Sequence, residues 1–177
     1  WVDDITVENL VLDGNREANE ELNGNYVGGV FLQHCNRYRF QHVVSRNFNG
    51  DGFSFQVCDD VQFERCRAEN NANLGFHPGS GSQRPLFNDC QALHNSQGIF
   101  FCWGVTDGLA QRCTLSNNSA YGCSIGHRDT DNQLLDCTLE KNGVHGLLFR
   151  QPQSPFRGAH RNRIERCLFR NNGALGE

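Results

Sequence analysis

One short signature recurs along this chain at a nearly fixed interval. Five copies read Cys-x-x-x-x-Asn, and a sixth, His42 to Asn47, keeps only the asparagine; the five are Cys66/Asn71, Cys90/Asn95, Cys113/Asn118, Cys137/Asn142 and Cys167/Asn172. A glycine keeps the same interval of 23 or 24 residues, at Gly29, Gly52, Gly75, Gly98, Gly122 and Gly146. A repeat of this length indicates a solenoid, in which each unit packs on its neighbours.

The residues that follow each glycine alternate in the manner of a β-strand. The first and third positions are apolar in five of the six copies, as with Phe53 and Phe55 after Gly52. A second short apolar stretch ends at the repeated cysteine, as in residues 61–66. Period-two alternation predicts strands with these side chains inward, and helical periodicity appears nowhere. The pattern therefore predicts an all-β fold, a parallel β-helix of about six to seven rungs. The repeated asparagines are expected to form a hydrogen-bonded ladder in one turn.

The repeat resembles that of right-handed parallel β-helix proteins of the pectate-lyase-like superfamily, over about residues 5–175. Residues 5–15 are similar to the opening rung of many members, including alginate C5-epimerases. The resemblance implies a long polysaccharide bound along the outer face of the strands. We expect an extracellular or periplasmic location. It implies no particular reaction, since the superfamily includes lyases, epimerases, hydrolases and non-catalytic fibres. We expect one β-helix domain over residues 1–177, a piece of a longer protein without its caps.

The charge and the cysteine content limit the classes of partner and metal that we expect this protein to bind. The net charge of −4 gives no indication of a nucleic-acid or membrane-surface partner, and no apolar run is long enough to span a bilayer. Five of the nine cysteines share one repeated position and should stack about 4.8 Å apart. Disulfides fit that separation, but a column of reduced, buried thiols is the favoured interpretation. Zinc-binding spacings are absent.

The connection that follows each glycine-led strand lengthens along the chain. We number the rungs from Gly29 as rung one. The connection is short in rungs one and two and then grows, through residues 79–84, 103–107 and 126–132, to residues 150–163 in rung six. Long loops on one flank of a repeat array usually form its binding face. Rungs three to six are therefore the predicted binding flank.

In-register stacking predicts which outward residues are neighbours. Ser54, His77 and Phe100 share one outward column, and Gln56, Gly79, Cys102, Gly126 and Arg150 share another. Gly79 and Gly126 are expected to leave a shallow groove beside Cys102 and Trp103. Trp103 should lie next to His127 on the adjacent rung, with His77 and Arg150 nearby, and a sugar ring packs well on tryptophan.

These residues suggest roles in an enzyme acting on uronates. The candidate catalytic residues are His77, His127, Asp129, Asp131 and Arg150, and the candidate substrate-binding residues are Gln56, Trp103, Arg128, His160 and Arg161. A lyase would use a histidine as base and an arginine to neutralise the carboxylate. A hydrolase would draw on Asp107, Asp129 and Asp131.

Each assignment has a structural alternative. Asp129 and Asp131 beside His127 and Arg128 could form a general-base or Ca²⁺ site, or the loop could form salt bridges with itself. No other cofactor or metal ligand set is indicated. His77 could simply hydrogen-bond a neighbouring loop, and Trp103 could pack under a further layer. His160 and Arg161 could pin a long loop instead of binding a carboxylate.

Two family motifs do not carry over. Alginate epimerases have Tyr-Gly-Phe-Asp-Pro-His where this chain reads Leu74-Gly-Phe-His-Pro-Gly79, so all three functional positions differ. Asp59-Asp60 and Gly126-His127 resemble polygalacturonase elements but lie three rungs apart, about 14 Å. That exceeds the separation of about 6.5–9.5 Å expected for an inverting carboxyl pair.

The sequence thus favours a carbohydrate-active β-helix protein that binds an extended acidic polysaccharide on the loops of rungs three to six. Lyase and hydrolase activity are both open, and enzymatic activity itself is undecided. The alternative is a non-catalytic structural or adhesive segment, as in a fibre or surface repeat. Enlarged loops on one flank favour a binding site over that alternative, and the oligomeric state is not predicted.

Overall fold

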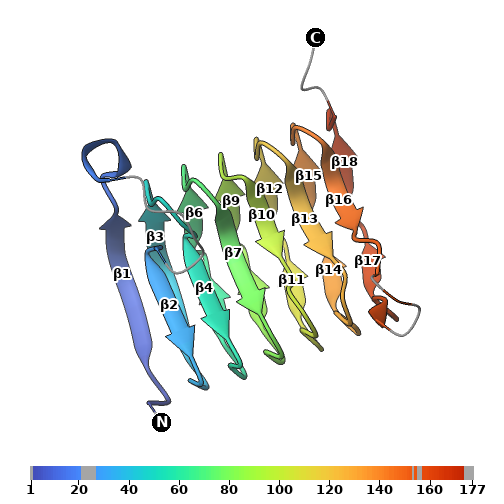
Figure 1. The fold of residues 1–177 in the computed structure, drawn as a ribbon, viewed down its shortest axis with the longest axis horizontal. Coiled ribbons are helices and arrows are strands. Elements are labelled where there is room, and N and C mark those ends of the chain that lie inside the picture. The colour runs from blue at the N-terminus through green and yellow to red at the C-terminus, as the bar shows by residue number, and fades with distance from the viewer. Residues whose placement is uncertain (1, 21–26, 153, 155–156, 174–177) are drawn as a thin grey trace.

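The computed structural model describes residues 2–20, 27–152, 154 and 157–173 as a stack of short parallel strands (Figure 1). One sheet contains the strands that follow the repeated glycines. In spatial order they are β2 (Val30–Gln33), β4 (Phe53–Gln56), β7 (Leu74–Gly79), β10 (Gln97–Phe100), β13 (Tyr121–Ile125) and β16 (His145–Phe149). We call it the glycine-led sheet. One short 3₁₀ helix, η1 (Arg16–Ala18), follows the first strand.

The remaining strands form the other wall of the solenoid. The long strands β1 (Thr6–Asp13) and β3 (Arg39–Arg46) pair with each other. Beyond β3 the wall splits into two ladders. The first is β5 (Gln62–Glu64), β8 (Leu86–Asn88), β11 (Leu109–Gln111), β14 (Gln133–Leu135) and β17 (Arg163–Glu165); the second is β6 (Arg67–Glu69), β9 (Gln91–Leu93), β12 (Thr114–Ser116), β15 (Thr138–Glu140) and β18 (Leu168–Arg170).

Every strand pair is parallel and in register with its counterpart one rung away, as for Phe53 and Phe76. The predicted all-β parallel β-helix is therefore confirmed. The structure completes about five turns, slightly fewer than the six to seven rungs predicted. The six glycine-led strands are separated by five such turns.

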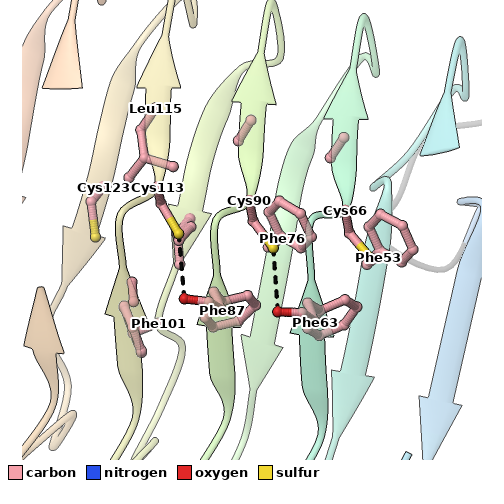
Figure 2. Close-up of a cluster of buried hydrophobic side chains, with 14 of the residues drawn as sticks. Phe53, Phe63, Cys66, Phe76, Phe87, Cys90, Phe101, Cys113, Leu115 and Cys123 are labelled. Carbon is pink, nitrogen blue, oxygen red and sulfur yellow. Dashed lines mark hydrogen bonds between the residues drawn. The ribbon is translucent and has the colours of Figure 1, made fainter. Parts of the chain in front are cut away.

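Stacked aromatic rings fill the first half of the core, and aliphatic side chains such as Leu115 and Ile125 fill the rest (Figure 2). Phe40, Phe63 and Phe87 lie ring on ring, with centroids 4.9 and 5.2 Å apart. Phe53 and Phe76 form a second stack at 5.2 Å, which meets the first edge-on. Burial of these rings and their offset packing provide the main hydrophobic stabilisation. The inward alternation predicted for residues such as Phe53 and Phe55 is confirmed.

The repeated asparagines and cysteines are interior columns. The Asn71 side-chain amide donates to Asn95 Oδ1 at 3.0 Å, and Asn118 donates to Asn142 Oδ1 at the same distance. All nine cysteines are free, so the preferred interpretation of reduced thiols is confirmed. Each thiol in the repeated column donates to a backbone carbonyl of the preceding rung, as Cys90 Sγ does to Phe63 O at 3.4 Å.

The outer corners carry arginine–aspartate pairs between rungs. Each arginine donates hydrogen bonds to the aspartate carboxylate of the preceding rung, as Arg112 Nε does to Asp89 Oδ1 at 2.8 Å. Arg84 with Asp60 and Arg166 with Asp136 repeat this geometry. The hydrogen bond from Arg112 holds the pKa of Asp89 below its usual value. Within the described part of the chain, no helix is long and apolar enough to cross a membrane.

Candidate functional site

Trp103 and His127 form a stacked aromatic pair at the surface of the loop flank. Trp103 follows β10 and His127 follows β13, and both have left-handed backbone with φ of 61° and 49°. Their rings lie face to face, with centroids 4.8 Å apart and planes within 11°. The Trp103 residue is 38% exposed. As the register predicts, the two rings are neighbours, and each covers one face of the other.

A buried ion pair lies behind this surface. Asp129 is fully buried, and its Oδ2 accepts a hydrogen bond from Arg150 Nη2 at 2.9 Å. Its Oδ1 accepts the amides of Gly104 and Val105, at 2.9 and 3.0 Å. The amide of Gly126 donates to Oδ2 at 2.8 Å. Asp129 therefore joins the turn that follows Trp103 to the turn that contains His127.

The environment of Asp129 suits a structural role. Burial raises its pKa above the ordinary value, and the hydrogen bonds from the amides of Gly126 and Val105 and the positive charge of Arg150 oppose that rise. Both carboxylate oxygens are occupied by donors from the chain itself. A carboxylate in this position orders the loop and offers no free oxygen to a substrate.

Arg150 reaches back across two rungs. Its Nη1 donates to Ser124 Oγ at 2.7 Å and its Nη2 to Phe101 O at 2.5 Å. The guanidinium also lies 4.2 Å from the centre of the Phe100 ring, a cation–π contact. The side chain is largely buried and its charge is neutralised internally. These contacts position the loop and leave little of the guanidinium for a substrate carboxylate.

The shallow groove predicted at Gly79 and Gly126 is filled. The Gln56 side chain lies over Gly79, where an added Cβ would come within 2.1 Å of Gln56 Nε2. Arg150 lies over Gly126 in the same way, with its Cβ 2.7 Å from an added Cβ. Long side chains from the adjacent rungs occupy the spaces that the glycines leave. Cys102 lies between them, and burial raises the pKa of its thiol to about 11, so it is protonated at neutral pH.

His77 belongs to a second buried polar group, on the outer face of the glycine-led sheet. Its Nδ1 lies 2.7 Å from Asp51 Oδ2 and 3.3 Å from Ser54 Oγ. The ring meets Phe100 edge-on, with centroids 5.5 Å apart. His77 Nε2 is buried without a hydrogen-bond partner. A histidine oriented by a carboxylate has the chemistry of a general base, but here its free nitrogen is buried.

Sequence reasoning did not identify Asp51. The register places Asp51 beside Leu74, whose amide donates to Asp51 Oδ1 at 3.0 Å. His77 lies three residues after Leu74 on that strand, so the Asp51 carboxylate contacts it diagonally across the ladder. An aspartate directly before a repeated glycine is the one sequence signal, because the corresponding positions in the other rungs carry no acid.

Asp131 and Arg161 pair with each other at the outer corner. Arg161 Nε lies 2.7 Å from Asp131 Oδ1 and Nη2 lies 2.6 Å from Oδ2. This bidentate contact lowers the pKa of Asp131. Asp131 therefore forms an ion pair at the surface, whereas Asp129 forms a buried one. Among the described residues, no group of three or more histidine, cysteine or acidic side chains could hold a metal ion, and a Ca²⁺ site at these two aspartates gains no support.

The remaining predicted residues lie at the surface of the flank. Arg128 and His160 are exposed, and neither makes an ion pair with a described residue. Arg128 donates its amide to Arg157 O, which ties its loop to the longest connection. The last loop, predicted at residues 150–163, includes residues 153, 155 and 156, which lie outside the described residues. The predicted residues left for a ligand are thus the exposed Trp103, Arg128 and His160 and the partly buried His127, whose Nδ1 is buried without a hydrogen-bond partner.

A family model described as "Right handed beta helix region" matches residues 4–173, nearly the whole chain. The protein therefore belongs to the right-handed β-helix family, and the solenoid is right-handed. A search of curated proteins found no match.

Proposed function

We propose that this protein binds an extended acidic polysaccharide on the flank formed by rungs three to six. The observation that carries the proposal is the exposed Trp103 side chain, fixed in place by stacking on His127. Stacking between sugar rings and aromatic faces buries apolar C–H surface while hydroxyls remain free to bond with water. The exposed part of Trp103 offers apolar ring surface for such a contact on the loop flank, where an extended chain could cross successive rungs.

Unpaired positive charge supports an acidic ligand. Arg128 is next to His127 and exposed, and His160 is exposed on the following rung. By contrast, Arg161 and Arg150 are already paired with carboxylates of the chain. Arginine favours carboxylates because its planar fork can donate two hydrogen bonds at once. We therefore propose Arg128 as the residue that binds a uronate carboxylate. Such a ligand also fits the proposed extracellular or periplasmic location.

The geometry favours binding over hydrolysis or elimination at this flank. The carboxylates proposed for hydrolysis include Asp129, which is buried and saturated, and Asp131, which is held by Arg161. Asp107 is exposed, yet Asp131, its counterpart on the next rung, is engaged by that ion pair. His127 is the one histidine at the aromatic surface that could accept a proton from a bound sugar. Lyase activity through His127 is the second candidate, and unsaturated product tests for it.

The test compares Trp103→Ala with Phe31→Ala, since these two aromatic residues are about equally exposed, at 38% and 39%. Binding is measured by affinity electrophoresis and calorimetry on polygalacturonate, alginate and a neutral glucan. Loss of one stacking contact of about 0.5–1.5 kcal/mol should weaken binding about two- to tenfold for Trp103→Ala. Phe31→Ala should bind as the parent does.

A charge test accompanies it. Arg128→Gln should weaken binding to the polyuronates and leave binding to a neutral glucan unchanged. Equal binding by the parent and Trp103→Ala on every polysaccharide would contradict the proposal and favour a purely structural solenoid. In either case, absorbance of unsaturated ends and a reducing-sugar assay report whether the bound chain is cleaved.

A further inference from the structure

A chain of hydrogen bonds crosses the outer face of the glycine-led sheet. It begins at the buried carboxylate of Asp129, which accepts from Arg150 Nη2 at 2.9 Å. Arg150 Nη1 donates to Ser124 Oγ at 2.7 Å, and Ser124 Oγ lies 3.0 Å from Gln97 Oε1. Asp129 and Arg150 follow the C-terminal ends of their strands, whereas Gln97 is the first residue of β10. The contacts therefore connect the loop flank with the N-terminal ends of the glycine-led strands.

The arginine fixes the direction of the hydrogen bonds that follow it. A guanidinium can only donate, so Ser124 Oγ accepts from Arg150. The single hydroxyl proton of the buried Ser124 then needs an acceptor, which Gln97 Oε1 provides. This contact holds the Gln97 amide with its oxygen toward Ser124. Its NH₂ group has no acceptor among the described residues, and Gln97 is partly exposed, so two oriented donors remain for a ligand.

A second unused polar group lies beside Gln97 on the next rung. Tyr121 is the in-register neighbour of Gln97, and the ladder places their Cα atoms about 4.8 Å apart. The Tyr121 ring stacks on His145, with centroids 5.8 Å apart and planes within 13°. Tyr121 is partly exposed, and its hydroxyl has no hydrogen-bond partner in the part of the chain that the structure describes. An amide and a phenol hydroxyl are thus adjacent and unused.

These two groups have the chemistry to contact a sugar. Amide N–H and phenol O–H groups donate to hydroxyl and carboxylate oxygens, and both are neutral, in contrast to Arg128 on the loop flank. Tyr121 and His127 lie six residues apart on one rung, a separation of at most about 22 Å. The partly exposed Phe100 lies on the sheet face between these two ends. One extended oligosaccharide of several rings can therefore contact both places.

We propose that Gln97 and Tyr121 form a second subsite for the acidic polysaccharide, and that Ser124 is the positioning residue that orients Gln97. This subsite rests on the proposed function, because it extends the ligand that contacts Trp103 and Arg128. The bound chain runs from the loop flank across the outer face of β13 to the N-terminal ends of the strands. Short oligosaccharides occupy the loop flank alone, whereas long ones contact both places.

A series of ligand lengths tests this subsite. Calorimetry measures the affinity of oligogalacturonates and oligoalginates, from disaccharide to decasaccharide, for the parent chain and for Gln97→Leu, Tyr121→Phe and Ser124→Ala. Gln133→Leu is the matched control, because Gln133 is also partly exposed but lies on β14 of the opposite wall. Far-UV circular dichroism and thermal unfolding confirm that each variant is folded.

The expected result depends on ligand length. Gln97→Leu and Tyr121→Phe should each weaken the binding of long oligosaccharides about two- to tenfold, the effect of one net hydrogen bond, and should leave short ones unaffected. Ser124→Ala should show the same length dependence, because it releases the Gln97 amide, although Ser124 is itself fully buried. A change in melting temperature without this length dependence indicates a purely structural role and contradicts the proposal. Gln133→Leu should bind as the parent does at every length.

Failure of this subsite can be distinguished from failure of the proposed function. If Gln97→Leu binds long oligosaccharides as tightly as the parent does, while Trp103→Ala binds them more weakly, the second subsite is wrong and the loop-flank site stands. An equal loss for short and long oligosaccharides also overturns the second subsite, because it removes the dependence on length. If the parent binds no oligosaccharide of any length, both proposals are wrong.

Discussion

The buried Asp129–Arg150 pair should be the most sensitive polar contact of the loop flank. In Asp129→Asn, one carboxylate oxygen becomes an NH₂ group. Whichever oxygen is replaced, a donor then faces a donor, either the amides of Gly104 and Val105 or the Gly126 amide and Arg150. The substitution also leaves the Arg150 charge without a buried partner. Removal of one partner of a buried ion pair costs about 3–5 kcal/mol of unfolding free energy.

The matched control is Asp89→Asn, at an exposed corner pair. Asp89 is held by Arg112 through two hydrogen bonds, but both side chains are partly exposed to water. Exposed pairs contribute at most about 1 kcal/mol. Urea unfolding followed by circular dichroism gives both values, and an unchanged m-value shows that the same surface is exposed on unfolding.

A double-mutant cycle isolates the coupling. Arg150→Met alone leaves the Asp129 carboxylate buried without its cation, so it should also destabilise strongly. The double variant should cost clearly less than the sum of the single variants. If Asp129→Asn costs no more than Asp89→Asn, the assignment of Asp129 as the anchor of the turns around Trp103 and His127 is wrong.

Two further predictions concern the scaffold. Asn118→Ala should destabilise by about 2–6 kcal/mol, since it leaves the buried amide of Asn95 and the carbonyl of Ala92 without partners, each worth about 1–3 kcal/mol. Asn172→Ala, at the end of the same ladder, should cost less in the same urea assay, and equal losses would contradict the ladder's stabilising role. Acid should destabilise the fold below about pH 4, because hydrogen bonds from arginine lower the folded-state pKa of Asp4, Asp60, Asp89, Asp131 and Asp136. A pKa lowered on folding adds stability above the unfolded-state pKa, and this is lost as pH falls through the folded-state pKa. Thermal unfolding between pH 7 and 2 measures this loss of stability. Salt at 1 M should reduce the pH dependence, and a melting temperature independent of pH would refute the prediction.

Periodicity alone determined most of the architecture. The repeat of 23 or 24 residues sets which residues stack, so the inward Phe53 and Phe76, the asparagine ladder and the neighbouring rings of Trp103 and His127 could all be predicted. The reason is geometric: in a parallel ladder, equivalent positions of successive rungs lie about 4.8 Å apart, whatever their side chains.

Only the tertiary structure shows the contacts between residues that are not at equivalent positions of neighbouring rungs. Arg150 reaches back two rungs to Phe101 O, and Asp51 reaches diagonally to His77, neither of which follows from the stacking of equivalent positions. The path of the loop turns Asp129 inward and leaves Asp131 at the surface, although only one residue separates them. Sequence spacing specifies where a backbone position lies in a ladder, whereas side-chain length, rotamer and loop path determine what that residue contacts.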